Sequence, residues 1–582
     1  MLENPPMKAN GRKILLAFIL IAAAILLYEG WKRFWFLTDD AFIAFRYVSN
    51  SMLGYGYTWN PPPFRPVEGY TSFLWVALLD FIWRAFDIQP PDIVNHLSLG
   101  FSCLTLFLVT WAVLRMKLAP AMERWRLVFL PLILLGILSN RTFLAWTSSG
   151  METAMFNFFF TLWVFIAILG RQRSCVWTAG LTGSAVLVYL SRPDGIAVVL
   201  SSVLMLYFSL RFHIGHGTLN KKWFFSVSPL LIVATHLLWR KSFYGEWLPN
   251  TYYAKVVAPW PEAGLRYFAS FVLEYGLWVW LFLLLVLVYL RLKKSGFQNW
   301  HKKPPTNGSI PPSFPNDAKA SVFTAISIAT LLFHFGYYTF VVGGDHFEYR
   351  VYSHLIPLIF LSFLWMLNRF RLKPRNAVLL LVLFTLISLP LPWIHWKLMK
   401  DTRAATTAMQ TPISGKFPPV FHVYTEAFDS LQEWLIKRLI CIRHQEHKIF
   451  YEYHTWLYPS RAKGKNIQGG TFPVLASGTV GVPGWALPHV VILDELGLND
   501  YVIARSPFRR TERLMAHERV PPPGYVESFQ PNVLVDQPGH ITILPPSRNL
   551  TKDYIIATER YWINEIKIMN TQLEEMSQRQ AK

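Results

Sequence analysis

The chain has 582 residues, of which 53% are hydrophobic, 16% are aromatic and 16% are charged. Soluble globular proteins carry about 25% charged residues, so the composition excludes an ordinary soluble protein. The net charge of +21 does not predict a nucleic-acid partner, because much of the excess lies in short loops between apolar segments and no basic helix or zinc knuckle accompanies it.

Apolar segments of nearly the length needed to cross a bilayer recur through the first 400 positions. The pattern predicts a polytopic α-helical membrane protein with eleven spanning helices. We place them near residues 14–30, 97–115, 126–141, 151–169, 176–191, 195–211, 224–240, 269–290, 320–342, 351–367 and 376–395. The apolar segment 72–86 is short and carries Asp80 and Arg84, so we expect it to lie at the membrane interface.

The charges of the loops predict the orientation. With the N-terminus in the cytoplasm, the cytoplasmic loops contain "RMKLAPAMERWR", "RQR", "RFHIGHGTLNKK", "RLKKSGFQNWHKK" and "RFRLKPR", as the positive-inside rule requires. Counting 72–86 as a span would move all five to the outside. We therefore expect residues 1–398 to form a transmembrane module whose first outer loop is 31–96.

The residues from 399 to 582 are expected outside the membrane as a soluble α/β or α+β domain. "FPVLASGTV" and "HVVILDELG" resemble strands that lead into turns, and "DSLQEWLIKRLICI" has the pattern of an amphipathic helix. The final residues predict a polar helix or a frayed tail.

The first outer loop begins with two adjacent carboxylates, Asp39 and Asp40, in "FLTDDAFIAFRYV". Such residues at the end of a short interfacial helix can simply cap it. Arg46 and Glu68 follow in the same loop, however, and ionisable residues gathered at one membrane face indicate a site.

Several segments expected on the outer side are similar to those of a known family. They are "DDAFIAFRYVSNSMLGYGYTWNPP", "RPVEGYTSFLW", "SSGMETAMF", "LSRPDGIAVVL", "YGEWLPNTYYAKV", "GGDHFEYRVYSHLIPLIF", "TVGVPGWALPHVVILDELGLNDYVIAR" and "MAHERVPPPGYV". In this order they resemble GT-C-fold, polyprenyl-phosphate-sugar-dependent glycosyltransferases, and among these the bacterial relatives of the mycobacterial terminal arabinofuranosyltransferase. The extra prolines of "NPPPFRPVEGYTS" and the form "VGVPGWALP" depart from the family pattern, which bears on acceptor specificity.

The resemblance implies an inverting glycosyltransferase at the outer face of the bacterial cytoplasmic membrane. It would move a sugar, arabinofuranose or a related one, from a polyprenyl-phosphate donor to a cell-envelope glycan, lipid or protein. The family's first-loop acid acts as the base, which places that role on Asp39 or Asp40. We expect Asp39 to be the base and Asp40 to orient it or to bind a cation, and the opposite assignment stays open.

The departing phosphate needs cations, and the sugar needs hydrogen-bonding groups. For the phosphate we predict Arg192, Lys255, His346, Arg350 and Arg46. For the sugar or the acceptor we predict Glu68, Glu152, Asp194, Asn250, Tyr253 and Asp345. The cations would otherwise be interfacial anchors, and Arg46 would otherwise neutralise the two aspartates. No cofactor is assigned with certainty, although an oxygen-rich site with Asp40 or Asp345 would suit Mg²⁺, Mn²⁺ or Ca²⁺.

Two other functions fit the same pattern. One is a transporter or flippase of lipid-linked saccharides, which predicts polar residues along the interiors of the spans. The sequence gathers its polar residues at one face instead. The other is a non-catalytic envelope-assembly protein whose outer domain only binds glycan, and such a protein would tolerate the loss of Asp39 and Asp40.

Overall fold

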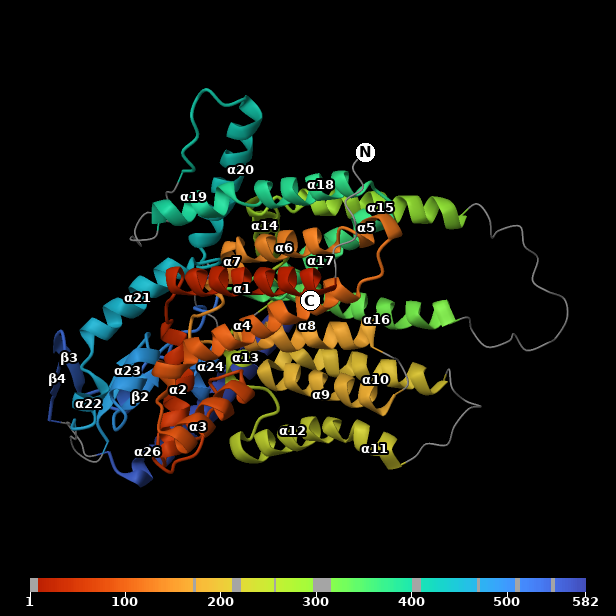
Figure 1. The fold of residues 1–582 in the computed structure, drawn as a ribbon. Coiled ribbons are helices and arrows are strands. Elements are labelled where there is room, and N and C mark those ends of the chain that lie inside the picture. The colour runs from red at the N-terminus through yellow and green to blue at the C-terminus, as the bar shows by residue number, and fades with distance from the viewer. Residues whose placement is uncertain are drawn as a thin grey trace.

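The computed structural model describes residues 9–170, 174–211, 221–255, 258–296, 316–399, 410–467, 472–507, 513–545 and 550–581. Figure 1 shows a bundle of long helices, with shorter helices and two small sheets at the end where α2, α3 and α23 lie. Helix α5 lies at the opposite end of this bundle.

The described part of the first 399 residues contributes only helices, apart from isolated bridges. The α-helices are α1 (Ala9–Arg33), α2 (Asp39–Met52), α3 (Phe73–Phe86), α4 (Pro90–Arg115), α5 (Pro120–Glu123), α6 (Arg126–Leu138), α7 (Arg141–Ala145), α8 (Thr153–Leu169), α9 (Cys175–Ser191), α10 (Ile196–Arg211), α11 (Lys221–Val227), α12 (Leu231–Tyr244), α13 (Asn250–Lys255), α14 (Pro261–Glu274), α15 (Trp278–Gly296), α16 (Asn316–Gly336), α17 (Leu355–Arg369), α18 (Pro374–Ile387) and α19 (Pro390–Met399). Short 3-10 or π turns are η1 (Pro193–Gly195), η2 (Ser228–Leu230), η3 (Tyr337–Val342) and η4 (Arg350–Tyr352).

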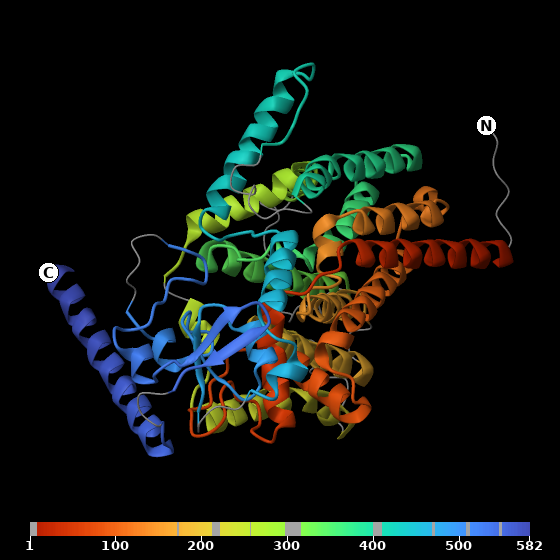
Figure 2. The ribbon, with the colours of Figure 1, turned by 90° about the vertical axis from the view of Figure 1, so that its left-hand side faces the viewer.

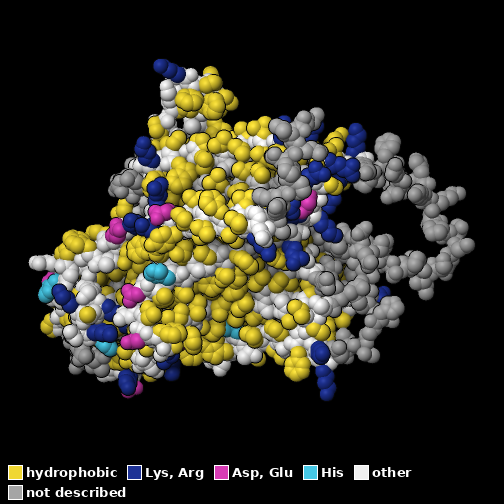
Figure 3. Space-filling view, in the orientation of Figure 1, with side chains coloured by type: hydrophobic (Ala, Val, Ile, Leu, Met, Phe, Trp, Pro, Cys, Tyr) yellow, Lys and Arg dark blue, Asp and Glu magenta, His cyan; other side chains and the backbone are white. Residues whose placement is uncertain are grey.

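Six helices of the described residues are long and apolar enough to cross a membrane, or seven if the bent pair α14 and α15 counts as one span. Four further apolar helices are shorter: α6, α8, α9 and α17. Each of the eleven predicted segments overlaps one of these helices. Figure 3 shows apolar side chains over the middle of the bundle and Lys and Arg toward its two ends, as expected of a membrane-embedded helical protein.

Three of the five basic loops that carried the orientation argument lie wholly or largely outside the described residues, at 171–173, 212–220 and 297–303. Segment 72–86, expected at the membrane interface, forms α3. This helix packs against α2, α4 and α9 and exposes Phe81 and Phe86.

The C-terminal residues form helices and two two-stranded sheets. The elements are α20 (Pro419–Ile436), α21 (His444–Leu457), α22 (Arg461–Gly464), β1 (Val474–Ser477), α23 (Gly481–Ala486), β2 (Val491–Asp494), α24 (Tyr501–Ala504), α25 (Tyr525–Ser528), β3 (Val533–Gln537), β4 (His540–Ile543) and α26 (Lys552–Ala581). Both predicted strands are present, as β1 and β2. They pair in parallel, with Val474 opposite Val491, and β3 and β4 form an antiparallel hairpin.

The C-terminal elements share a hydrophobic core with the first outer loop. Phe45, Trp59 and Tyr70 of that loop lie in the same buried cluster as Trp485 and Ile492. Trp59 Nε1 also donates a hydrogen bond to the carbonyl of Ile492, at 2.9 Å. Figure 2 shows these elements together at one end of the molecule, with α26 along their outer side. The first outer loop and the C-terminal elements thus pack on each other around one hydrophobic core.

Candidate functional site

Helix α2 begins at the acidic pair because of its cap. The Thr38 hydroxyl accepts a hydrogen bond from the Ala41 N–H at 3.2 Å, which satisfies a donor that the first turn leaves free. Asp39 and Asp40 then occupy that first turn, where negative charge is favoured by the helix dipole. Successive residues of a helix are about 100° apart, so the two carboxylates leave α2 in different directions.

Asp39 turns toward the C-terminal elements. Its Oδ2 accepts a hydrogen bond from the Gly481 N–H at 3.0 Å, and its Oδ1 accepts one from the Val482 N–H at 2.7 Å. Burial raises the pKa of Asp39 to about 7, against the opposing effect of these two bonds. A raised pKa often marks a functional carboxylate, but here both oxygens already hold the N-terminus of α23.

Arg46 lies two turns further along the same face of α2 and holds the other end of α23. Its guanidinium donates hydrogen bonds to the carbonyls of Gly484, Leu487 and Val490 at 2.8, 3.2 and 2.8 Å. It also donates to the carbonyl of Trp59 at 2.8 Å. The side chain is fully buried, and burial lowers the pKa of Arg46 to about 9. The acid Asp39 at the N-terminus of α23 and the base Arg46 at its C-terminus are the charges that the dipole of this helix favours.

The glycines of "VGVPGWALP" permit this close packing. A Cβ added to Gly481 would lie 1.8 Å from the Asp39 carbonyl oxygen, and one added to Gly484 would lie 2.9 Å from Arg46 Cδ. These two residues must therefore be glycine for α23 to lie against α2.

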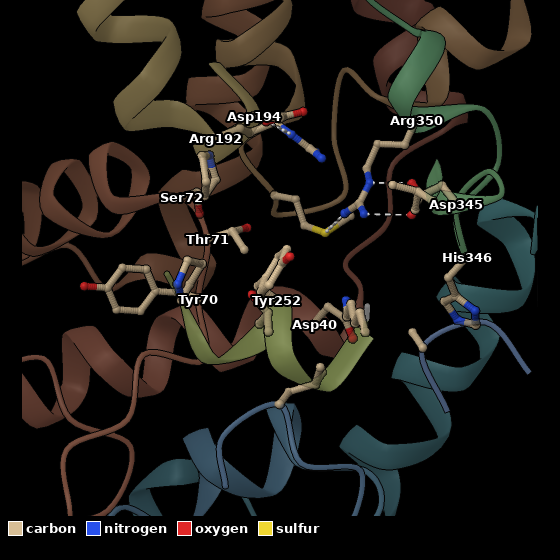
Figure 4. A pocket seen from close by; sticks show the side chains of 18 of the residues that line it. Asp40, Tyr70, Thr71, Ser72, Arg192, Asp194, Tyr252, Asp345, His346 and Arg350 are labelled. Atoms are coloured by element: carbon tan, nitrogen blue, oxygen red, sulfur yellow. Dashed lines mark hydrogen bonds and ion pairs between the residues drawn. The ribbon is translucent and has the colours of Figure 1, made fainter. Parts of the chain in front are cut away.

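Asp40 faces the other way, into a cavity of about 250 Å³ (Figure 4). The cavity gathers eight of the residues that the sequence analysis singled out: Asp40, Glu152, Arg192, Asp194, Lys255, Asp345, His346 and Arg350. They come from α2, the start of α8, η1, α13 and the turn before η4. Residues from five separate parts of the chain thus meet at the end of the bundle next to the first outer loop.

Two arginines of the cavity are held in place by carboxylates. Arg350 makes a bidentate ion pair with Asp345, at 2.8 and 3.0 Å. Arg192 lies 3.4 Å from both Glu152 and Asp194 and donates to the Tyr338 hydroxyl at 2.7 Å. In Figure 4 the Arg350 guanidinium extends into the cavity. The acids thus fix the directions of the guanidinium groups and neutralise part of their charge.

Lys255 is the third cation of the cavity. No ion pair within 4 Å joins it to any acid of the described residues. Burial lowers the pKa of Lys255, while the nearby Asp40 acts in the opposite direction. Among the described residues, none donates a hydrogen bond to the partly exposed Asp40 carboxylate either. Lys255 and Asp40 are therefore a cation and an anion that remain available to a ligand.

His346 is neutral rather than cationic in this arrangement. Its Nδ1–H donates to the carbonyl of Leu439 at 2.7 Å. Burial, followed by the charge of His517, lowers its pKa to about 4. His346 therefore contributes a hydrogen-bonding ring near pH 7 and not a fixed positive charge.

Tyrosines that the sequence analysis did not assign form much of the remaining wall: Tyr70, Tyr252, Tyr337 and Tyr338. Tyr252 stands between Asp40 and the arginines in Figure 4. Aromatic rings at a membrane surface are so common that their sequence pattern gave no separate signal. Their place in the cavity makes them candidates for stacking on a flat or cyclic ligand.

A second cavity of about 280 Å³ lies between Asp40 and the C-terminal elements. The residues that line both cavities are Asp40, Ile43, Lys255, His346, Leu498 and Ala516. The second cavity is also lined by Glu446, His447, Asp494 and His517, and by Asp39, the neighbour of Asp40 in the chain. Asp40 and Lys255 thus stand at the boundary between two chambers, one among the helix ends and one against the C-terminal elements.

The other predicted site residues lie outside the first cavity. Glu68 forms a buried bidentate ion pair with Arg240 of α12, at 2.6 and 3.1 Å. Asn250 Nδ2 donates to the carbonyls of Gly497, Leu498 and Asp500 at 2.9 to 3.1 Å. The Glu68 ion pair attaches the first outer loop to α12. The Asn250 hydrogen bonds attach α13 to the C-terminal elements.

Tyr253 also lies outside this cavity, and its hydroxyl donates to Glu246 at 3.3 Å. The guanidinium of Arg505 lies over its ring, 3.9 Å from the centroid. The part of the chain that the structure describes contains no cluster of three or more His, Cys, Asp or Glu arranged to hold a metal ion.

A buried ionic network also escaped the sequence analysis. Arg141, Glu274, Glu348 and Arg443 all have side chains with 0% exposure. Arg443 pairs with Glu274 at 2.8 Å, and Arg141 pairs with Glu348. Their positions span 302 residues of sequence, from 141 to 443, so no local pattern reveals them. The network joins α7 and α14 to the start of α21.

No protein-family model matches the chain, and no curated protein matches it in sequence.

Proposed function

We propose that the protein is an integral-membrane inverting glycosyltransferase of the GT-C type. It would transfer a sugar, arabinofuranose or a related one, from a polyprenyl-phosphate donor to a cell-envelope glycan, lipid or protein. One observation carries the proposal: a carboxylate free of described hydrogen-bond donors, Asp40, lines two neighbouring cavities, and one of these is also lined by Lys255, Arg192 and Arg350.

The first cavity suits the donor. Lys255 would be the main phosphate ligand because it lacks an ion-pair partner among the described acids. Burial lowers the pKa of Lys255, and the negative charge of a bound phosphate would raise it again. Arg350 and Arg192, fixed by their carboxylates, would add directed hydrogen bonds. Glu152, Asp194 and the tyrosines would contact sugar hydroxyls and the sugar face.

The second cavity suits the acceptor. A hydroxyl entering from the side of His447 and His517 would meet Asp40 at the boundary of the two cavities. In this proposal Asp40 accepts the hydroxyl proton while the oxygen attacks the anomeric carbon from the face opposite the phosphate. The bond between the anomeric carbon and the phosphate oxygen breaks, the configuration inverts, and polyprenyl phosphate leaves with both electrons of that bond.

The membrane arrangement proposed here is the one that the sequence predicts. Eleven helices cross the bacterial cytoplasmic membrane, with the N-terminus inside and the residues after 398 outside. The apolar bundle and the gathering of the polar segments at one of its ends support it. The lipid tail of the donor would then remain in the bilayer while its phosphate reaches Lys255.

The test is single-turnover sugar transfer by the full chain in nanodiscs. Polyprenyl-phosphate sugars, arabinofuranose among them, would be offered with oligosaccharide acceptors from the cell envelope. The product would be identified by mass spectrometry and its anomeric configuration by NMR. We expect transfer with inversion by the wild type and a loss of about 100-fold in Lys255→Met. Lys241→Met, which changes an exposed lysine of α12, is the matched control and should behave as the wild type.

Two outcomes would overturn the proposal. One is the absence of transfer from every donor while labelled polyprenyl-phosphate sugar crosses proteoliposomes, which would identify a flippase. The other is glycan binding without transfer that is unchanged in Asp40→Asn, which would identify an assembly protein.

A further inference from the structure

Helix α20 exposes a group of large apolar side chains at its N-terminal end. Phe417, Val420, Phe421 and Val423 are 51, 67, 49 and 64% exposed. We call residues 416–423 the α20 tip. The sequence from 410 to 425 contains no Asp or Glu, and its single Lys or Arg is Lys416. The second half of the helix is different, because Phe428, Gln432 and Leu435 are buried.

The helix lies across the direction of the membrane-spanning helices. It packs along α14, and α14 is bent by 100° from the apolar helix α15. Figures 1 and 2 both show α20 pointing away from the bundle at a steep angle to α1 and α18, and projecting past α18 and α19. Its position along the spans is set at the bend, where Tyr424 donates to the Leu273 carbonyl at 2.6 Å and accepts from Trp278 Nε1 at 3.3 Å. Trp278 is the first residue of α15, so the tip lies at the level of this end of the α15 span.

We infer that the α20 tip is a membrane-surface anchor that inserts its apolar side chains among the lipids beside the bundle. A helix that lies in the membrane plane, with an apolar face and a basic residue at its end, is suited to the boundary between headgroups and acyl chains. Lipid is favoured as the occupant because the bundle past which the tip projects also has an apolar surface. There, α18 exposes Leu379, Leu383 and Leu386, which are 64, 47 and 55% exposed. Lys416 would meet anionic headgroups.

The anchor would hold the cavity wall that contains Asp345 and His346 at a fixed depth relative to the bilayer. The chain leaving α20 continues to Cys441, whose N–H donates to the Asp345 carbonyl at 2.9 Å. The Ile442 N–H donates to the carbonyl of His346 at 2.8 Å. Because both acceptor residues line a cavity, the seating of α20 in lipid would set their height relative to the bilayer. The inference rests on the shape and exposure of α20 and is independent of the proposed reaction.

The test places one fluorescent label on α20 in the full chain. Cys103 and Cys175 are replaced by Ser, and the buried Cys441 is kept. A bimane is attached at Val423→Cys or Val420→Cys in the tip. The control label is at Glu433→Cys, an exposed polar position of the same helix. Each protein is placed in nanodiscs and quenched either by iodide in water or by lipids that carry nitroxides near the headgroup.

We expect both tip labels to be quenched several-fold less by iodide than the Glu433→Cys label and strongly by the nitroxide lipids. Equal iodide quenching at the tip and the control positions would overturn the inference. Protection of the tip from both quenchers would also overturn it, and would show that a second copy of the chain or another protein covers the helix. No enzyme activity enters the readout.

Discussion

The two sides of α2 carry similar charges but use them differently. On the side that faces α23, both oxygens of Asp39 and all three nitrogens of the Arg46 guanidinium have partners, and the groups are buried. Asp40 lines both cavities, is partly exposed and accepts from no described residue, whereas Asp39 lines the second cavity only. Charges whose hydrogen bonds are complete hold the fold together, whereas a charge left open at a cavity is available for chemistry.

The same contrast separates the two sets of arginines away from α2. Arg141 and Arg443 belong to a network without solvent exposure, which reaches neither cavity described above. Arg192 and Arg350 line the first cavity, and the carboxylates that pair with them line it as well. We therefore expect substitutions in the first set to change stability and substitutions in the second set to change ligand binding.

The largest effect on stability is expected at Arg46. Arg46→Met leaves the carbonyls of Trp59, Gly484 and Val490 buried without their donor, which should lower the free energy of unfolding by about 3–5 kcal/mol. Thermal unfolding in detergent, followed by tryptophan fluorescence, would measure it. Arg266→Met removes an exposed pair with Glu262 and should cost less than about 1 kcal/mol. Equal effects of the two substitutions would contradict the structural role of Arg46.

Loss of Lys255 should reduce donor use while the fold persists. Lys255→Met is expected to lower kcat/KM for the donor by about 100-fold, or about 2.7 kcal/mol, because the phosphate loses a cation that has no ion-pair partner among the described acids. Lys255→Arg should recover part of this activity. Steady-state kinetics with a varied donor concentration would show it, and an unchanged kcat/KM in Lys255→Met would place the phosphate elsewhere.

A smaller effect is expected where α23 touches α2. Gly481→Ala brings a Cβ against the Asp39 carbonyl and should lower the free energy of unfolding by about 1–3 kcal/mol through overpacking. Gly478→Ala lies three residues away, where an added Cβ meets nothing within 4 Å, and should leave the melting temperature nearly unchanged. Similar melting temperatures of the two variants would mean that α23 does not lie against α2 as described.

Another predicted effect concerns pH. Burial raises the pKa of Asp39 to about 7 from an ordinary value of 3.8, so the folded protein holds this proton more tightly than the unfolded chain. The resulting stabilisation is fully present below about pH 4 and is lost as the pH rises to about 7. The difference in melting temperature between the wild type and Asp39→Asn should therefore shrink from pH 5 to pH 8. A difference that grows would show that the two N–H donors outweigh burial.

Hydropathy predicted most of the helical fold because each apolar segment carries its own signal. All eleven predicted segments overlap observed helices, and the two predicted strands pair as β1 and β2. The clustering of Arg192, Lys255, Asp345 and Arg350 was also foreseeable, since their segments all fall on the same side of the apolar helices.

The division of work between Asp39 and Asp40 was not foreseeable from the sequence. It depends on which side of α2 meets α23, and α23 lies more than 430 positions away along the chain. The same holds for Arg46, whose acceptors are mostly backbone carbonyls and have no sequence pattern. His346 was expected to be a cation, and only its burial beside His517 shows that it is neutral near pH 7.

The most direct test of the account compares Asp39→Asn with Asp40→Asn in the same preparation, measuring both the melting temperature and single-turnover transfer. We predict that Asp40→Asn keeps the wild-type melting temperature and loses transfer by at least about 100-fold, because the acceptor hydroxyl loses its base. Asp39→Asn should lower the stability by about 1–3 kcal/mol and retain transfer at temperatures where it is folded. Transfer that is lost in a stable Asp39→Asn and preserved in Asp40→Asn would contradict the account.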